Sequence, residues 1–231
     1  MRLRLTGTAA LVALAASLVL AGSASALVGI YRNGMETDGQ RGEIRKLSGE
    51  RCGRGGSDTA FKITVGKRTE ECSYRTPVLG RDVEVAATMR LLDGTPKKVR
   101  NSSYLALSLR AGAGAHYQLI VFPLQRKAQL VKSLPDGQAK FLRIARKVRT
   151  IKGVNRANPM RLRAFNVTSG PEKGSCKIHA YVGSELVAEF TDDAAGDLQG
   201  RATGFAVGAT KNAKGAVGSA DDVVVRVPNP F

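Results

Sequence analysis

Two acidic residues, Asp82 and Glu84, have the spacing that places a pair of carboxylates on one face of a β-strand. Glycoside-cleaving enzymes need such a pair, because one carboxylate attacks or activates water while the other donates a proton, roughly 5 Å apart in retaining enzymes. The next positions on that face are Ala86 and Thr88, so no third acid follows. We therefore expect Asp82 and Glu84 to be solvent-facing strand residues, with a glycoside-processing enzyme that uses them as the alternative.

Other catalytic arrangements have less support in the sequence. His116 and His179 are the two histidines, and no G-x-S-x-G turn presents a serine nucleophile to either of them. The cysteines lack the C-x-x-C spacing typical of zinc sites. The sequence therefore predicts no catalytic residue, and it favours a protein that binds its ligand without changing it.

Basic residues are concentrated in one part of the chain. The protein has 36 Lys and Arg against 19 Asp and Glu, a formal net charge of +17. Between Gly94 and Pro171 there are sixteen basic residues and one acid, Asp136. Clustered positive charge attracts polyanions, although a positive surface that only maintains solubility is an alternative. We predict a ligand-binding basic surface made by Arg143, Arg146, Lys147, Arg149, Arg161 and Arg163, since the planar fork of arginine suits acidic groups.

The three cysteines divide into a pair and a single residue. Cys52 and Cys72 are close in sequence and flank one strand-like run. We predict a disulfide between them, which closes a loop of about 20 residues. Cys176 falls on the apolar side of an alternating segment, so we expect it to be buried as a small hydrophobic residue.

The segments that position these residues alternate between apolar and polar side chains along most of the chain. At 81–92 every second residue, from Val83 to Leu91, is apolar. The same alternation recurs at Phe61–Val65, Tyr117–Val121 and Val223–Val227. Less regular runs of this kind, also read as strands, lie at 104–110, 125–133, 140–144, 160–167, 176–182, 185–191 and 201–209. Turn-forming pairs such as Asp93-Gly94 separate these runs. The pattern predicts an all-β fold, a two-sheet antiparallel β-sandwich with little helix.

Residues 1–26 differ from the rest of the chain. Arg2 and Arg4 precede an apolar run at 9–21, and the small residues Ala24-Ser25-Ala26 follow, which is the pattern of a signal peptide. The run is shorter than the roughly 20 residues that cross a membrane as a helix. We predict cleavage after Ala26, a single domain over 27–231, and a secreted or cell-surface protein without a transmembrane anchor.

The segment Tyr181-Val182-Gly183-Ser184-Glu185-Leu186-Val187-Ala188 resembles a hairpin of the concanavalin A-like jelly rolls, in the laminin-G-like and glycan-hydrolase-related groups. Residues 104–110, 117–121, 204–207 and 221–225 are similar to other strands of that fold, so the likeness covers 81–227. The chain departs from the pattern in having Gly183-Ser184 where Asn-Gly is usual and in having no Trp.

The resemblance implies a jelly-roll fold and, in many members, a structural calcium ion between the first and last strands. Calcium prefers carboxylate and backbone oxygens as ligands. Glu36 and Asp222 are the candidates by position, and no other cofactor is expected.

Together these features predict a secreted, non-catalytic, lectin-like β-sandwich that binds a glycan or another anionic polymer of the cell envelope. Nucleic acid is not the expected partner, because few aromatic side chains alternate with the basic ones. Two alternatives remain: the glycoside-processing enzyme of the same fold, and a structural or adhesion domain whose partner is a protein.

Overall fold

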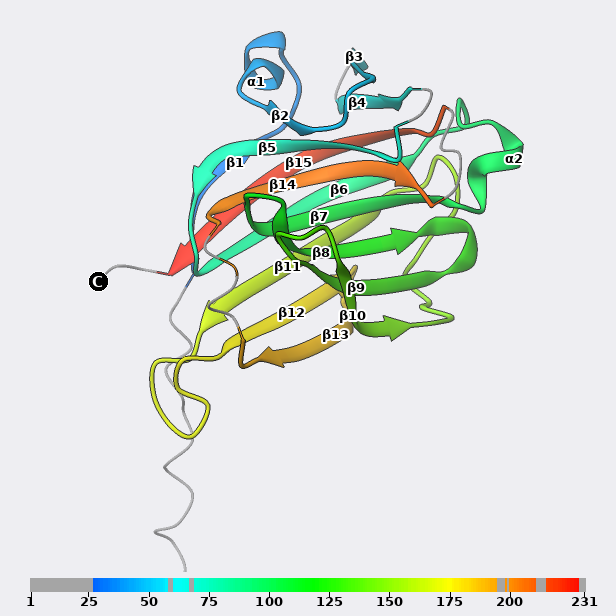
Figure 1. The fold of residues 1–231 in the computed structure, drawn as a ribbon. Helices are drawn as coiled ribbons and strands as arrows, with labels where there is room; N and C mark the ends of the chain where they lie inside the picture. Colours follow the sequence, from blue (N-terminus) through cyan, green and yellow to red (C-terminus); the bar gives the residue numbers. More distant parts are fainter. Residues whose placement is uncertain are drawn as a thin grey trace, which may run out of the picture.

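The computed structural model describes residues 27–57, 60–66, 69–194, 198, 200–210 and 215–228. Two antiparallel β-sheets face each other across a shared core (Figure 1), which confirms the predicted sandwich. The predicted signal peptide at 1–26 lies outside the described residues. No helix in the described part of the chain is long and apolar enough to cross a membrane.

One sheet has eight strands in the order β13-β12-β11-β6-β15-β4-β3, with β1 also paired to β15. The last strand is shared between two neighbours, because its first part pairs with β4 and its second part with β1, where Leu27 lies opposite Pro228. The strands are β1 (Leu27–Asn33), β3 (Cys52–Ser57), β4 (Ala60–Val65), β6 (Val83–Leu91), β11 (Asn158–Asn166), β12 (Cys176–Val182), β13 (Glu185–Asp192) and β15 (Val217–Pro228).

The other sheet has seven strands in the order β10-β9-β8-β7-β14-β5-β2. One side of it, from the edge strand β10 to β7, is a meander, since β7, β8, β9 and β10 follow one another in the chain and pair as neighbours. The strands are β2 (Arg45–Ser48), β5 (Glu71–Leu79), β7 (Ser103–Gly112), β8 (Ala115–Phe122), β9 (Lys127–Ser133), β10 (Ala139–Ala145) and β14 (Ala202–Ala209).

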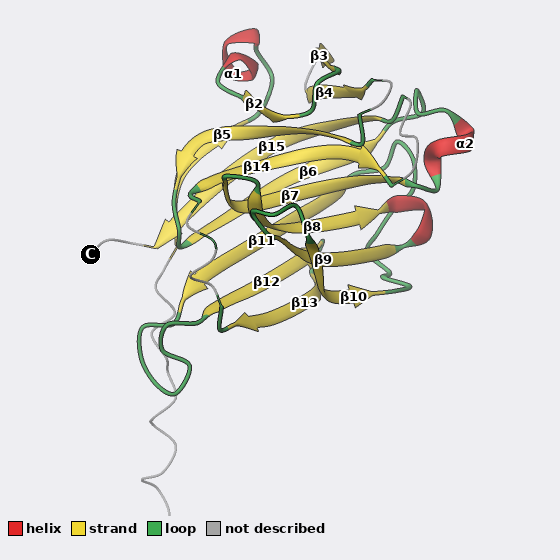
Figure 2. Ribbon diagram, viewed as in Figure 1, coloured by secondary structure: helices red, strands yellow, loops and turns green. Residues whose placement is uncertain are grey.

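Helix is confined to short segments at the ends of strands (Figure 2). The α-helices α1 (Asp38–Gly42) and α2 (Lys97–Arg100) and the 3-10 helix η1 (Pro123–Gln125) are the helices of the described residues. The low helix content that the sequence predicted is therefore confirmed for this part of the chain.

The core forms where the alternating runs of the two sheets meet. On β6 every second side chain from Val83 to Leu91 is buried, as predicted, and Tyr117, Leu119 and Val121 of β8 in the opposite sheet belong to the same core. Burying one such aliphatic side chain stabilises the fold by about 1.5–3 kcal/mol relative to leaving it exposed. The period of two along the strands is thus the main determinant of which residues pack inside.

Four strands were not among those predicted, namely β1, β2, β3 and β5. All four residues of β2 are exposed, so an apolar face is missing from its sequence. β3 contains Gly53, Gly55 and Gly56, which are typical of turns rather than strands. On β5 several of the buried residues are polar, including Ser73 and Thr76. The sequence of β5 therefore lacks the apolar alternation that indicates a half-buried strand.

Cys52 and Cys72 form a disulfide, as predicted. Because Cys52 lies in β3 and Cys72 in β5, the bond joins the eight-stranded sheet to the seven-stranded sheet. Cys176 is a free cysteine with no exposed surface, which confirms its predicted burial. Burial raises the pKa of the Cys176 thiol to about 11, so this group stays protonated at neutral pH.

Replacing Cys52 and Cys72 together by serine is expected to lower the free energy of unfolding by about 3 kcal/mol. The unfolded chain then regains the freedom of a loop that spans 20 residues. Urea unfolding of the variant and the wild type measures the difference. A reductant should bring the wild type to the stability of the variant; a loss smaller than about 1 kcal/mol would contradict the prediction.

A buried polar cluster also connects the sheets. Asp192 of β13 accepts a hydrogen bond from the Tyr117 hydroxyl of β8 at 2.5 Å, and the Lys132 ammonium of β9 lies 2.8 Å from the same oxygen. Burial by itself would raise the pKa of Asp192, but the hydrogen bonds from Lys132 and Tyr117 hold it below its ordinary value. Asp192 is therefore ionised inside the sandwich and held by groups of the opposite sheet.

Candidate functional site

A pocket of about 620 Å³ at one end of the sandwich is lined by five basic side chains. We refer to it as the cationic pocket, and its basic residues are Arg90, Arg126, Arg149, Lys152 and Arg156. Ile151, Gly153, Asn155 and Ala157 also line it, and none of these described lining residues is acidic. These residues come from the end of β6, the turn after η1 and the connection between β10 and β11. Segments far apart in sequence therefore meet there.

The connection between β10 and β11 is held in shape by a buried asparagine. Asn158 has no exposed surface. Its side-chain oxygen accepts the N–H of Lys152 at 2.8 Å, and its amide donates to the carbonyls of Lys152 and Arg156 at 3.1 and 3.0 Å. Two of the basic residues are thus fixed through their own backbone by one side chain.

Further contacts attach this connection to the body of the sandwich. Asn155 donates its N–H to the carbonyl of Leu91 at 2.7 Å, and its side-chain oxygen accepts the N–H of Asp93 at 2.9 Å. Val148 donates its N–H to the carbonyl of Arg126 at 3.0 Å. Val148 and Ile151 are both buried in the core. The basic side chains therefore stand on a backbone that is already ordered before a ligand arrives.

Positive charge in this region is only partly neutralised. Arg90 lies 3.8 Å from Asp221, and among the described residues no ion pair reaches Arg126, Arg149, Lys152 or Arg156. Nearby, Lys127 lies over the ring of Phe122 at 4.1 Å. Partial burial and then the neighbouring Arg146 lower the pKa of Lys127. Cations are close enough here to affect one another, which an anionic ligand would relieve.

The six basic residues predicted from the sequence lie in separate places. Arg149 lines the cationic pocket. Arg161 and Arg163 lie on β11 and point away from the core, where Arg161 covers the ring of Tyr181 at 4.1 Å and Arg163 the ring of Phe165 at 4.8 Å. These two arginines share the outer face of the eight-stranded sheet with Arg90, because the intervening residues of β6 and β11 face the core.

The remaining three predicted residues lie near the edge of the seven-stranded sheet. Arg143 lies on β10, with its guanidinium 5.5 Å from the ring of Phe190 on β13. Arg146 and Lys147 follow β10 and are exposed. The structure therefore brings one of the six into the pocket and distributes the others over adjoining surfaces.

Four residues of the cationic pocket were missed by sequence reasoning, namely Arg90, Arg126, Lys152 and Arg156. The last three belong to the basic segment between Gly94 and Pro171, so the charge asymmetry was a signal for them. Arg90 lies outside that segment and reaches the pocket through the pairing of β6 with β11.

Asp82 and Glu84 do not form an open pair of carboxylates. Glu84 accepts a hydrogen bond from Arg226 at 2.6 Å and lies 3.9 Å from Arg161. Asp82, just before β6, accepts the N–H of Asn166 at 2.8 Å and lies 3.5 Å from the buried guanidinium of Arg110. Each carboxylate is held by different cations. The expectation that both face solvent is wrong for Glu84, which is buried between its ion-pair partners.

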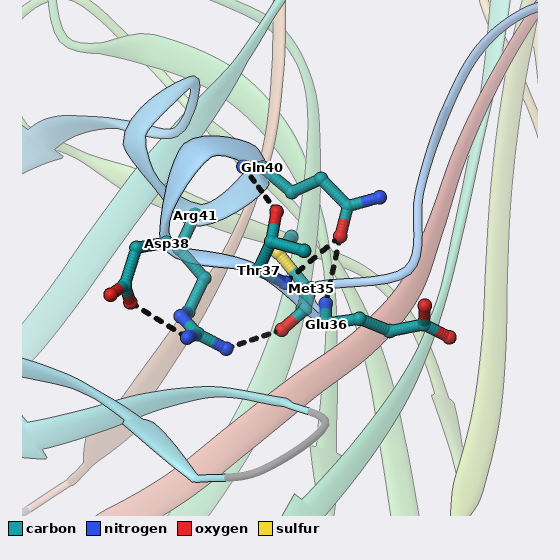
Figure 3. Close-up of polar contacts among 6 residues, drawn as sticks. All are labelled: Met35, Glu36, Thr37, Asp38, Gln40 and Arg41. Carbon is teal, nitrogen blue, oxygen red and sulfur yellow. Dashed lines mark hydrogen bonds and ion pairs between the residues drawn. The ribbon is translucent and has the colours of Figure 1, made fainter.

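Glu36 and Asp222, the calcium candidates, lie near the junction of β1 and β15. Glu36 lies just before α1, and its N–H donates to the side-chain oxygen of Gln40 in that helix. The Glu36 carboxylate extends away from the helix (Figure 3). Asp222 lies 3.8 Å from Arg32, a cation that competes with a metal. In the described ranges no group of three or more His, Cys, Asp or Glu side chains could hold a metal ion. Calcium at this position stays a prediction.

No family model matches the sequence, and neither does any curated protein. Solved structures do resemble this one. The carbohydrate-binding module CBM66 from Bacillus subtilis is 13% identical, with a TM-score of 0.58 over 78% of this chain and 93% of that chain. A Bacillus subtilis protein of unknown function with a galectin-like fold is 13% identical, with a TM-score of 0.59 over 87% and 97%.

The apo Crh5 transglycosylase is 8% identical, with a TM-score of 0.58 over 87% of this chain and 85% of that chain. The chain has a lectin-like jelly-roll fold. At these identities the likeness concerns the fold alone, since proteins of one fold perform many functions. The cationic pocket is built from strand β6 and from the connections that follow η1 and β10.

Proposed function

We propose that this protein binds a polysaccharide or another cell-envelope polymer that carries acidic groups, and that the cationic pocket receives one such group. The observation that carries the proposal is the convergence of five basic residues on one pocket whose described lining contains no acid: Arg90, Arg126, Arg149, Lys152 and Arg156. The likeness to a carbohydrate-binding module supports a glycan as the ligand at the level of the fold.

Arginine favours a carboxylate or phosphate ligand over a neutral one. Its planar group can donate two parallel hydrogen bonds to one acidic group, which gives orientation as well as attraction. Since the backbone around Asn158 is ordered by three hydrogen bonds, less conformational entropy is lost when the ligand binds. The pocket therefore combines charge, geometry and preorganisation.

The outer face of the eight-stranded sheet can extend the binding surface. Arg161 lies opposite Ala86 on β6, four residues before Arg90 along the same strand. That separation is roughly 13 Å of strand. A polymer longer than one or two sugar units would span the distance from the pocket to the Arg161 and Tyr181 pair, which offers a cation beside an aromatic ring.

Secretion is part of the proposal. The Cys52–Cys72 disulfide suits an oxidising compartment outside the cytoplasm, and the signal pattern at 1–26 predicts export. A polymer of the envelope is then the polyanion that the protein meets most directly.

Binding of the wild type to polygalacturonate is expected to weaken at least tenfold when sodium chloride is raised from about 0.05 M to about 1 M, because salt screens exposed charges. Isothermal titration calorimetry at both salt concentrations measures the change, with neutral dextran as the uncharged control polymer. Equal affinity at both salt concentrations, or equal binding of dextran, would remove the anionic ligand from the proposal.

A further inference from the structure

A second pocket, of about 430 Å³, lies on the outer face of the seven-stranded sheet and differs from the cationic pocket in its chemistry. We refer to it as the Glu71 pocket. Its lining includes Leu47, Glu71, Ser108, Ala113, Ala115, His116 and Gln118. No Lys or Arg is among the described residues that line this pocket. Among the described residues of its lining, Glu71 is the one acidic side chain.

One oxygen of the Glu71 carboxylate is available to a ligand. Oε2 accepts hydrogen bonds from the Tyr104 hydroxyl at 3.1 Å and from the Gln118 amide at 2.7 Å. Among the described residues, no hydrogen bond or ion pair reaches Oε1. Both donors are neutral, so no described cation is paired with this carboxyl group.

Tyr104 is fixed beside Glu71 by a glycine of the neighbouring strand. A Cβ atom at Gly208 would lie within van der Waals overlap of the Tyr104 ring, so only glycine leaves room for the ring to cross β14. Tyr104 also packs against Phe122 with ring centroids 5.6 Å apart. Burial raises the pKa of the Tyr104 hydroxyl, which therefore remains a hydrogen-bond donor. The orientation of Glu71 is thus set by rigid neighbours.

The hydroxyl of Ser108 is a second polar group in this pocket that could bind a ligand. Its side chain lines the Glu71 pocket, it is 5% exposed, and its hydroxyl oxygen has no hydrogen-bond partner among the described residues. A buried hydroxyl without a partner is unfavourable, because no hydrogen bond replaces those it makes with water. Ser108 lies opposite Gln118 across the β7–β8 ladder, so its hydroxyl is a cross-strand neighbour of the amide that binds Glu71.

His116, which also lines the Glu71 pocket, adds no positive charge to it at neutral pH. Burial lowers the pKa of His116 below its ordinary value of 6.5, so the ring is neutral at pH 7. Burial also raises the pKa of Glu71, which reflects the cost of a carboxylate without a cation nearby. A cation supplied from outside would offset that cost.

We infer that the Glu71 pocket binds a small ligand through a protonated primary amine. The ammonium group donates to Oε1 of Glu71 and to the hydroxyl of Ser108, and the apolar wall of Leu47 and Ala113 contacts the carbon atoms of the ligand. A charged donor is favoured over a neutral hydroxyl because ion pairing strengthens as water is excluded. An amino sugar and a lysine side chain share this chemistry.

This site is separate from the proposed anion-binding function. Arg126 of the cationic pocket follows η1 after the end of β8, whereas Ala115 of the Glu71 pocket begins that strand. The strand alone separates them by roughly 24 Å. Loss of one activity therefore leaves the other to be measured on the same protein.

The test is titration of the full-length mature protein with glucosamine and, separately, with Nα-acetyl-lysine methylamide at neutral pH, followed by NMR or calorimetry. We expect at least one of these amines to bind, at least tenfold tighter than N-acetylglucosamine, which lacks the ammonium group. The better of the two amines identifies the source of the ligand.

Glu71→Gln is expected to lower the affinity for that amine at least tenfold, and Ser108→Ala several-fold. Glu70→Gln changes an exposed acid one residue away and should leave the affinity unchanged. Circular dichroism checks that each variant folds. Equal binding of N-acetylglucosamine, no binding of either amine, or unchanged affinity in a folded Glu71→Gln protein would overturn the inference.

Discussion

Reversing the charges of Arg149 and Arg156 together, as R149E/R156E, is expected to lower the affinity for polygalacturonate about a hundredfold, which is about 2.8 kcal/mol. Both side chains line the cationic pocket. The change removes two attractive charges and introduces two repulsive ones at the point where an acidic group would sit. Calorimetry at low salt measures the loss, because screening reduces the contribution of exposed charges.

A matched control separates the pocket from net charge. R45E/K173E produces the same change in net charge at two exposed positions. Arg45 lies on β2 at the far edge of the seven-stranded sheet, and Lys173 lies in the turn between β11 and β12, opposite the end of β11 that carries Asn158. We expect the affinity of this variant for polygalacturonate to fall no more than a few-fold. Equal losses in both variants would mean that binding is diffuse and that the pocket is not the site.

Lys132→Met is expected to destabilise the fold by about 3–5 kcal/mol, because it leaves the Asp192 carboxylate buried without its cation. The Lys132 ammonium lies 2.8 Å from Asp192, and their side chains are 5% and 8% exposed. Methionine fills a similar volume, so the loss reports on charge more than on packing. The free energy of unfolding in urea measures the effect.

Two further variants test the cause of that loss. Lys140 lies directly opposite Lys132 in the β9–β10 ladder but is exposed, so Lys140→Met should change stability by no more than about 0.5 kcal/mol. The double variant K132M/D192N removes both charges and should recover much of the stability. A Lys132→Met protein that loses less than about 1 kcal/mol would show that Asp192 is satisfied without the lysine.

The same cluster sets an acid limit for stability. The pKa of Asp192 in the folded protein is below its ordinary value of 3.8, so the unfolded chain binds this proton more readily. Its contribution is therefore present above about pH 4 and is lost as the pH falls through the lower folded value. At neutral pH the stabilisation is complete.

The sandwich could be predicted because its main strands alternate regularly. The side chains of Phe61, Ile63 and Val65 face the core, as do those of Val83 and Val85, and each lies where a period of two places it. The Cys52–Cys72 pairing also followed from the spacing of the cysteines. Alternating burial along a strand and the short separation of two cysteines are both properties of a local stretch of chain, so a sequence pattern can predict them.

The candidate sites could not be predicted to the same degree, because strand pairing creates them. Arg90 and Arg156 meet across β6 and the loop before β11, and nothing in their local sequence connects them. Glu71, Ser108 and Gln118 converge from three strands, of which β5 had no apolar alternation to reveal it. Such sites depend on register, which sequence patterns specify only after the partners are known.

The pairing of β1 with β15 determines how the protein would be oriented when it is linked to a solid support. Leu27 lies opposite Pro228, so the first described strand begins where the last one ends. Arg90 lies opposite Ser219, near the other end of β15, roughly 30 Å of strand from Pro228. A support linked near Leu27 or Pro228 would therefore hold the molecule with Arg90 of the cationic pocket at the far end of β15. Immobilisation at that end is then compatible with capture of a bulky polymer.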